Sequence, residues 1–136
     1  MITQKEITLP PFKRGMHLIT GLIEKELGKL PETGMLNLFV KHTSAALTIN
    51  ENCDPEVRTD MDAFMDRLIP DNYPHFRHTQ EGNDDMPSHI KTSIFSTSLN
   101  IPITNGKLNM GIWQGIYFCE FRDNGRRRRI LVTIWE

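Results

Sequence analysis

Two asparagine–glycine pairs in the last third of the chain constrain the fold more than any other feature. Asn105-Gly106 separates the strand-like runs SLNIPIT and KLNMGIW, and Asn124-Gly125 separates YFCEFRD from RRRRILVTIW. Asn-Gly readily adopts the backbone angles of a tight turn, so each pair predicts a two-residue β-hairpin. We therefore expect antiparallel strands in this part of the protein.

The turn at Asn124-Gly125 also predicts which residues pair across the second hairpin. It would place Glu120 opposite Arg129, Arg122 opposite Arg127, and Cys119 opposite Ile130. One face would then belong to the core and the other would carry the charged residues. Two interpretations of the charged face stay open: an ion-pair ladder in solvent, or a face that binds anions or another subunit, because arginine forks suit phosphate.

Short strands and helices alternate in the rest of the chain. Strands are expected over residues 2–9, 15–19, 36–42 and 43–50. Thr20 is expected to cap a short helix whose inner side carries Ile23, Leu27 and Leu30.

Asp54 and Pro55 mark the start of the clearest helix. Asp is a good N-cap, and the missing N–H of proline has no cost at the first helical position. Apolar residues at helical spacing follow as far as Leu68. Residues 71–86 are expected to be irregular, and a short helix from about residue 87 to 96 would turn Ile90 and Ile94 inward.

This order of elements predicts one α+β domain over residues 1–136, mainly an antiparallel, sandwich-like or barrel-like sheet with two or three short helices. The 16 basic and 17 acidic residues nearly cancel, which argues against nucleic acid or a membrane as partner. Two cysteines give no disulfide framework, and no apolar run suits a signal peptide or a membrane span. A cytoplasmic protein is expected.

The stretch RHTQEGNDDMPSHI, residues 77–90, concentrates polar residues around Gly82. Glycine permits an unusual backbone angle that would bring Glu81 and Asn83 to one side. His89 is expected in the first turn of a helix, where the dipole disfavours protonation, and a neutral imidazole suits a metal ligand or a general base. The alternative is a polar surface loop whose acidic pair, Asp84 and Asp85, caps the helix.

His42 closes the apolar face of its strand, and Thr43 and Ser44 follow it. A lone histidine in such a place is more often a satisfied core or rim residue than a ligand. The neighbouring polar residues favour a site near one end of two paired strands. Asn50 belongs to the same group, although it also suits a turn before the Asp54 cap.

Longer motifs resemble one known family. KHTSAALTINENCDPEVRTD, RHTQEGNDDMPSHIK and MGIWQGIYFCEFRD, together with the arginine-rich end, are similar to the YjbQ family, also called the secondary thiamine-phosphate synthase family. The resemblance covers essentially the whole chain. It implies a homotrimer with a polar pocket, and a weak transferase activity that joins a pyrimidine methyl diphosphate to a thiazole phosphate with loss of pyrophosphate. The family-like positions are His42, Thr43, Ser44, Asn50, Glu51, Asp54, His78, Glu81, Gly82, Asn83, Asp85, His89, Gln114, Gly115 and Glu120.

Our first hypothesis is an enzyme that acts on a small phosphorylated metabolite. His42, His78 and His89 would converge as metal ligands or acid–base groups, and Glu81 or Asp85 would orient an imidazole. Histidines favour zinc, whereas a diphosphate favours magnesium, and no organic cofactor is expected. The expected substrate-binding residues are Thr43, Ser44, Asn50, Asn83, Gln114, Glu120 and Arg129.

Three alternatives remain beside this hypothesis. A metal-assisted phosphoester hydrolase is a second reaction within the enzyme class. A non-catalytic trimer could instead bind a metabolite or metal. The polar residues could also be structural, in which case His42→Ala and His89→Ala would lower thermal stability about as much as any activity.

Overall fold

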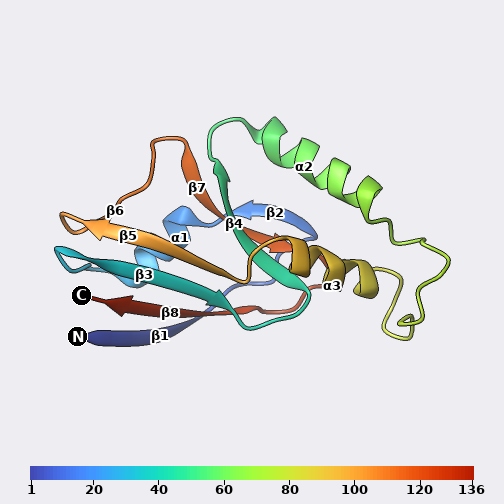
Figure 1. Cartoon of the computed structure of the whole chain (residues 1–136), viewed down its shortest axis with the longest axis horizontal. Helices are drawn as coiled ribbons and strands as arrows, with labels where there is room; N and C mark the ends of the chain where they lie inside the picture. The colour runs from blue at the N-terminus through green and yellow to red at the C-terminus, as the bar shows by residue number, and fades with distance from the viewer.

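Strands dominate the fold, which the computed structural model describes for residues 1–136. They form two antiparallel sheets, with strand orders β1-β8-β3-β5-β6 and β2-β7-β4 (Figure 1). This confirms the predicted α+β class with a mainly antiparallel sheet. None of the helices combines the length and apolar character needed to cross a bilayer. The elements are β1 (Ile2–Thr8), β2 (Gly15–Leu18), α1 (Thr20–Leu27), β3 (Thr33–Val40), β4 (Ala45–Glu51), α2 (Pro55–Leu68), α3 (Asp85–Ile94), β5 (Ser98–Thr104), β6 (Lys107–Leu108), β7 (Gln114–Glu120) and β8 (Arg129–Trp135).

The main apolar core lies between the two sheets. Leu36, Leu38 and Val40 of β3 are buried, as their alternation predicted. They belong to one cluster with Ile116 and Phe118 of β7, and α1 contributes to the same cluster. The two sheets therefore pack face to face, as in a sandwich.

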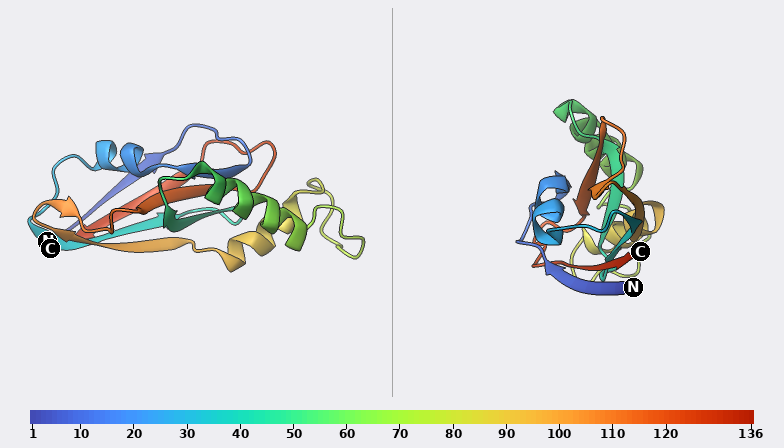
Figure 2. Two further views of the ribbon diagram at one scale, coloured as in Figure 1. Left: turned by 90° about the horizontal axis from the view of Figure 1, so that it is seen from above. Right: turned by 90° about the vertical axis from the view of Figure 1, so that its left-hand side faces the viewer.

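The outer face of the small sheet is covered as well. Tyr117 and Cys119 of β7 point away from the main core and form a second apolar cluster, against which Met61 of α2 and Phe95 after α3 pack. Strand β7 is thus buried on both faces. Figures 1 and 2 show α2, α3 and the segment that joins them at the end of the molecule opposite the two termini.

One of the two predicted hairpins forms and the other does not. Asn105-Gly106 turns β5 into β6, with Thr104 opposite Lys107. After Asn124-Gly125, in contrast, the chain leaves the small sheet: β7 pairs with β2 and β4, whereas β8 pairs with β1 and β3. The predicted pairing of β7 with β8 is therefore wrong. An apolar strand buried on both faces is better placed between two neighbours in its own sheet than at the end of a hairpin.

A capping residue was predicted for each of the first two helices, and the structure confirms only the one for α2. Asp54 accepts the backbone N–H of Glu56 at 2.9 Å and so caps α2 as expected. Thr20 does not cap α1 with its side chain, because its Oγ1 accepts the N–H of Ile116 at 2.8 Å instead. The hydroxyl joins the helix to β7, a partner far away in the sequence.

Helix α3 begins at Asp85, two residues earlier than predicted. His89 consequently lies in the second turn, where the dipole argument for a neutral ring does not apply. Ile94 is 58% exposed rather than turned inward. Helix α2 also buries less than its pattern predicted, since it contains no fully buried residue.

Candidate functional site

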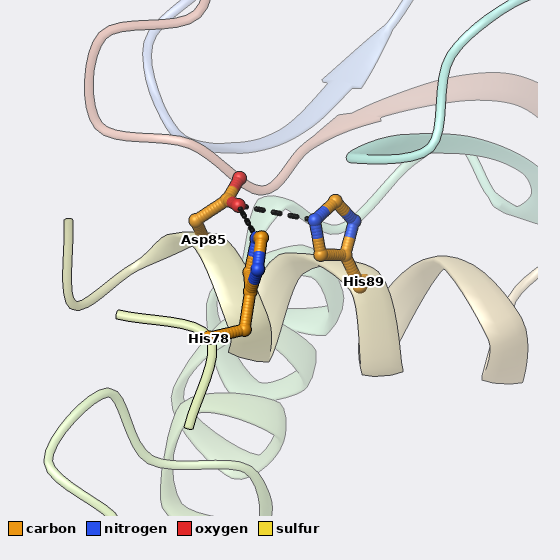
Figure 3. Close-up of side chains that lie close together, drawn as sticks. All are labelled: His78, Asp85 and His89. Carbon is orange, nitrogen blue, oxygen red and sulfur yellow. Dashed lines mark hydrogen bonds and ion pairs between the residues drawn. The ribbon is translucent and has the colours of Figure 1, made fainter. Parts of the chain in front are cut away.

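His78 and His89 converge on one carboxylate at the start of α3. The Nε2 atoms of the two rings lie 2.6 Å and 3.1 Å from Oδ2 of Asp85 (Figure 3). The ring centroids are 5.3 Å apart. One atom from each of the three residues could therefore serve as a ligand, and these atoms all lie within 4.8 Å of one another.

Local structure explains how this cluster forms. Asp85 and His89 are four residues apart on α3 and so occupy the same face of the helix. His78 comes from the preceding loop, which turns back at Gly82 with a φ of 112°. Side chains with a Cβ disfavour this angle, so the unusual backbone angle predicted at Gly82 is confirmed, whereas Glu81 and Asn83 line different pockets. Glu81 lies at the edge of the cluster, with a carboxylate oxygen 3.7 Å from Nε2 of His78.

Asp85 is 1% exposed and uses its two oxygens differently. Oδ2 faces the imidazoles, and Oδ1 accepts Nη1–H of Arg122 at 2.6 Å. Burial raises the pKa of this carboxyl, but the hydrogen bond with His78 and the positive charge of Arg122 outweigh burial, so the pKa lies below its ordinary value. Asp85 is therefore ionised at neutral pH.

Arg122 fastens the loop and the helix start together. Its Nε donates to Oδ2 of Asp84 at 2.9 Å, and its Nη2 donates to the carbonyl of Glu81 at 2.8 Å. Burial raises the pKa of Asp84, yet the N–H of Asp123 and the guanidinium of Arg122 hold it below its ordinary value. Asp84 occupies the N-cap position of α3 but makes no side-chain cap hydrogen bond, so the predicted capping bond does not form. The acidic pair is instead an ion-pair partner of Arg122.

The proton on His89 has a defined place. Its Nδ1 lies 2.8 Å from the backbone carbonyl oxygen of Thr43, which can only accept a hydrogen bond. Nδ1 must then carry the proton, and in a neutral ring Nε2 presents its lone pair to the carboxylate of Asp85 at 3.1 Å. Two acceptors at this distance repel each other unless a proton or a cation lies between them. The cluster is therefore suited to bind either one.

His42 lies outside this cluster, so the structure does not bring the three predicted histidines together as one ligand set. Its Nε2 accepts the backbone N–H of Arg129 at 2.9 Å. Burial, followed by the charge of Arg128, lowers the pKa of His42. The ring is thus neutral at pH 7 with its proton on Nδ1. His42 lines a neighbouring pocket of about 530 Å³ that also borders on Glu81 and Arg122.

A buried ion pair forms one wall of this pocket. Nε and Nη2 of Arg128 donate to the two oxygens of Glu120 at 2.8 Å and 2.6 Å. Nη2 also donates to Oγ of Ser44 at 3.0 Å. Glu120 is fully buried and pairs with Arg128. The predicted exposed ladder, in which Glu120 would face Arg129, does not form. The side chain of Arg129, which was predicted to hold phosphate, is exposed and does not line the pocket.

The remaining predicted substrate-binding residues lie in other places. Asn50 pairs with Gly115 near the far end of β4, and the strand rises about 17 Å from Ala45 to Asn50. Its amide contacts Met61, and Oε1 of Gln114 accepts a backbone N–H within its own loop. The structure therefore keeps Asn50 and Gln114 away from the histidines within one chain. Asn83 lines a separate hollow beside His78.

Sequence reasoning missed the two arginines that organise the site. Arg122 was placed in a cross-strand ladder, and Arg128 was given no role of its own. The adjacent aspartates Asp84 and Asp85 could have indicated a basic partner such as Arg122, because buried carboxylates require a positive charge nearby. Nothing local shows which arginine of the run 126–129 turns inward.

The chain has clear relatives. Residues 5–136 match the family described as UPF0047 protein YjbQ-like. The chain is 49% identical to UPF0047 protein YjbQ of Escherichia coli O157:H7 over 133 residues, which is 96% of each chain. It is 42% identical to UPF0047 protein YugU of Bacillus subtilis (strain 168), over 77% of this chain and 80% of that protein.

Solved structures of similar proteins share the fold. The crystal structure of the conserved hypothetical protein TT1486 from Thermus thermophilus has a TM-score of 0.82 at 33% identity, covering 94% of this chain and 97% of that one. An uncharacterised YjbQ/UPF0047 family protein from Clostridium acetobutylicum has a TM-score of 0.80 at 38% identity, covering 98% and 99%. These descriptions name a conserved family and no reaction.

Proposed function

The chain belongs to the YjbQ-like family UPF0047, and from that premise we propose that it is a metal-dependent enzyme for a small phosphorylated molecule. His78, Asp85 and His89 would hold a divalent cation. The observation that carries the proposal is the approach of two imidazole Nε2 atoms to one carboxylate oxygen, at 2.6 Å and 3.1 Å.

The donor set suits a transition metal. In a tetrahedral zinc site with bonds of about 2.1 Å, the ligand atoms lie about 3.4 Å apart. The three candidate atoms here lie within 4.8 Å of one another, so small side-chain shifts would suffice. Two nitrogen donors favour zinc over magnesium. The bonds from His89 to the Thr43 carbonyl and from Arg122 to Asp85 are the outer contacts that orient such ligands.

Metal-assisted hydrolysis of a phosphoester is the reaction that this set supports best. Three protein ligands leave a coordination position for water or substrate. A bound metal lowers the pKa of water and polarises a phosphoryl oxygen. Glu81 stands 3.7 Å from His78, with its side chain 64% exposed, and would take up or give a proton at the edge of the cluster.

Thiamine-phosphate synthesis is the second candidate, and the family resemblance favours it. That transfer releases pyrophosphate, and magnesium would normally bridge the diphosphate through oxygen ligands. Asp85 and Glu81 offer carboxylate oxygens, but the two imidazoles suit magnesium poorly. The product separates the two reactions, because a hydrolase releases phosphate and the transferase releases pyrophosphate.

Metal content and turnover together test the proposal. We expect the purified protein to hold zinc in stoichiometric amount by elemental analysis, and to release phosphate or pyrophosphate from candidate substrates. His89→Ala should lose both properties and stay folded. The control is His75→Ala, an exposed histidine of the same segment outside the cluster. Bound metal with no turnover would favour a binding protein, and unchanged turnover in His89→Ala would overturn the proposal.

We further propose that the chain assembles as a homotrimer in the cytoplasm. Phe64 and Leu68 of α2 are 66% and 60% exposed, and Ile112 and Trp113 are 80% and 60% exposed. Helix α2 has no fully buried residue, and exposed apolar side chains on an amphipathic helix are typical of a subunit contact. Both cysteines are unpaired, which supports a reducing compartment.

A further inference from the structure

The pocket beside His42 differs in chemistry from the histidine cluster. It has a volume of about 530 Å³ and no apolar residue in its lining. The lining contains one acidic residue, Glu81, and four basic residues, which are Arg122, Arg126, Arg127 and Arg128. The whole chain carries a formal net charge of −1, so this positive charge is a local concentration.

We propose that this pocket, which we call the Arg128 pocket, binds the phosphate group of a small phosphorylated molecule. The inference says where the phosphate of the proposed substrate binds, and it rests on the proposed function in that respect. Anion binding itself requires no metal and can be measured separately.

Arg128 is held in place before any ligand arrives. It is 9% exposed, and Glu120 and Ser44 occupy its Nε and Nη2. Nη1 makes no hydrogen bond, so it is the donor that this side chain offers to the pocket. A buried guanidinium fixed on two sides loses little conformational entropy when it binds an anion.

Two further donors line the same pocket. His42 accepts a hydrogen bond at Nε2 and therefore carries its proton on Nδ1, which has no partner within the chain. Ser44 accepts from Arg128 and keeps its own hydroxyl hydrogen to donate. Since Glu120 neutralises Arg128, the net positive charge comes from Arg126 and Arg127, which have no ion-pair partner. The fixed donors can hydrogen-bond to the oxygens of a phosphate dianion, and the two unpaired arginines can balance its negative charge.

The Arg128 pocket adjoins the proposed metal centre. Glu81 belongs to its lining and lies 3.7 Å from His78, and Arg122 belongs to its lining and lies 2.6 Å from Asp85. A substrate with its phosphate on Arg128 would therefore extend toward the histidine cluster. The volume exceeds that of a phosphate ion and leaves room for an organic group. A phosphate monoester or a diphosphate fits this description.

The test uses chelator-treated protein, with inorganic phosphate and pyrophosphate as probes in isothermal titration calorimetry. We expect saturable binding that Arg126→Gln combined with Arg127→Gln weakens about tenfold or more. Both side chains are exposed, so the fold should survive, and a thermal melt verifies this. The matched control is Arg67→Gln combined with Lys25→Gln, which removes two exposed charges outside the pocket and should leave binding unchanged.

Three outcomes would overturn the inference: no saturable binding, equal weakening in the control, or binding that appears only after metal is restored. His89→Ala separates this inference from the proposed function. It should lose metal and bind phosphate as the parent protein does. If the parent protein holds no metal but still binds phosphate at Arg126 and Arg127, the proposed metal centre is refuted and the phosphate-binding pocket is supported.

Discussion

At the scale of single residues, Gly125 shows how tightly the Arg128 pocket is built. A Cβ at this position would lie 1.9 Å from Oε1 of Glu120. Glu120 is fully buried and both of its oxygens accept from Arg128, so it has no room to move aside. The backbone of the loop lies directly on the ion pair, and only glycine allows this approach.

We expect Gly125→Ala to lower the free energy of unfolding by about 1–3 kcal/mol, the usual cost of overpacking. Urea denaturation measures the change. Gly21→Ala is the matched control, because Gly21 lies in α1 with no heavy atom within 4 Å of an added Cβ. That substitution should stabilise the protein by about 0.5–1 kcal/mol. Equal effects of the two substitutions would contradict the packing of the loop on Glu120.

Asp85 is the residue on which the proposed metal centre depends most. Asp85→Asn keeps the shape of the side chain and removes its charge, so zinc affinity should fall by about 100-fold or more. A competition titration against a coloured chelator measures this affinity. Asp60→Asn alters an exposed residue of α2 outside the cluster and should leave it unchanged. Equal affinities of Asp85→Asn and the parent protein would rule out this carboxylate as a ligand.

At the scale of elements, one carboxylate joins two helices and a loop. Lys91 of α3 is 2% exposed, and its Nζ lies 2.5 Å from Oδ1 of Asp66 on α2. Arg14, which precedes β2, donates to the same oxygen at 3.0 Å. This polar contact therefore links α2 both to α3 and to the segment before β2.

The stability of this helix pair should depend on pH. Burial raises the pKa of Asp66, but the hydrogen bonds from Lys91 and Arg14 outweigh burial and hold the pKa below its ordinary value. A carboxyl with a lowered pKa in the folded state stabilises above its unfolded pKa of about 3.9, and this contribution is lost as the pH falls through the folded pKa. Asp62 has a pKa raised mainly by burial and acts in the opposite direction.

Asp66→Asn tests this pH dependence. The substitution leaves the Lys91 ammonium without its carboxylate, so we expect a loss of about 1–2 kcal/mol at pH 7. The variant should lose less stability than the parent protein as the pH falls from about 5, just above the unfolded pKa, through the lower pKa of Asp66 in the folded state. Thermal unfolding followed by circular dichroism at each pH measures both effects. Parallel pH profiles for the two proteins would show that Asp66 does not contribute to acid sensitivity.

At the scale of the whole molecule, exposed apolar side chains predict assembly. Light scattering should give three times the 15.7 kDa of one chain. Phe64→Lys places a charge on the exposed face of α2, where Phe64 is 66% exposed, and should shift the protein toward monomers. Ile2→Lys is the control, because Ile2 is 70% exposed on β1, at the opposite end of the molecule from the α2–α3 segment. A parent protein with the mass of one chain would refute the trimer.

The sequence alone determined the features that arise within a few residues. Asp54 and Pro55 mark the start of α2, Asn105-Gly106 turns β5 into β6, and Gly82 reverses the loop before α3. The contact between Asp85 and His89 follows from their spacing of one helical turn. Backbone sterics, capping and periodicity act over short distances along the chain, so these features can be predicted from local residues.

Only the tertiary structure decided which distant residues meet. The pairing of β7 with β2 and β4 overrode the turn signal at Asn124-Gly125, because a strand that is apolar on both faces must be covered on both. The same crossing turned Arg128 inward to Glu120 and brought Arg122 to the acidic pair, and it left His42 in a separate pocket. Burying a charge requires a partner, but nothing in the adjacent residues specifies which one the fold will supply.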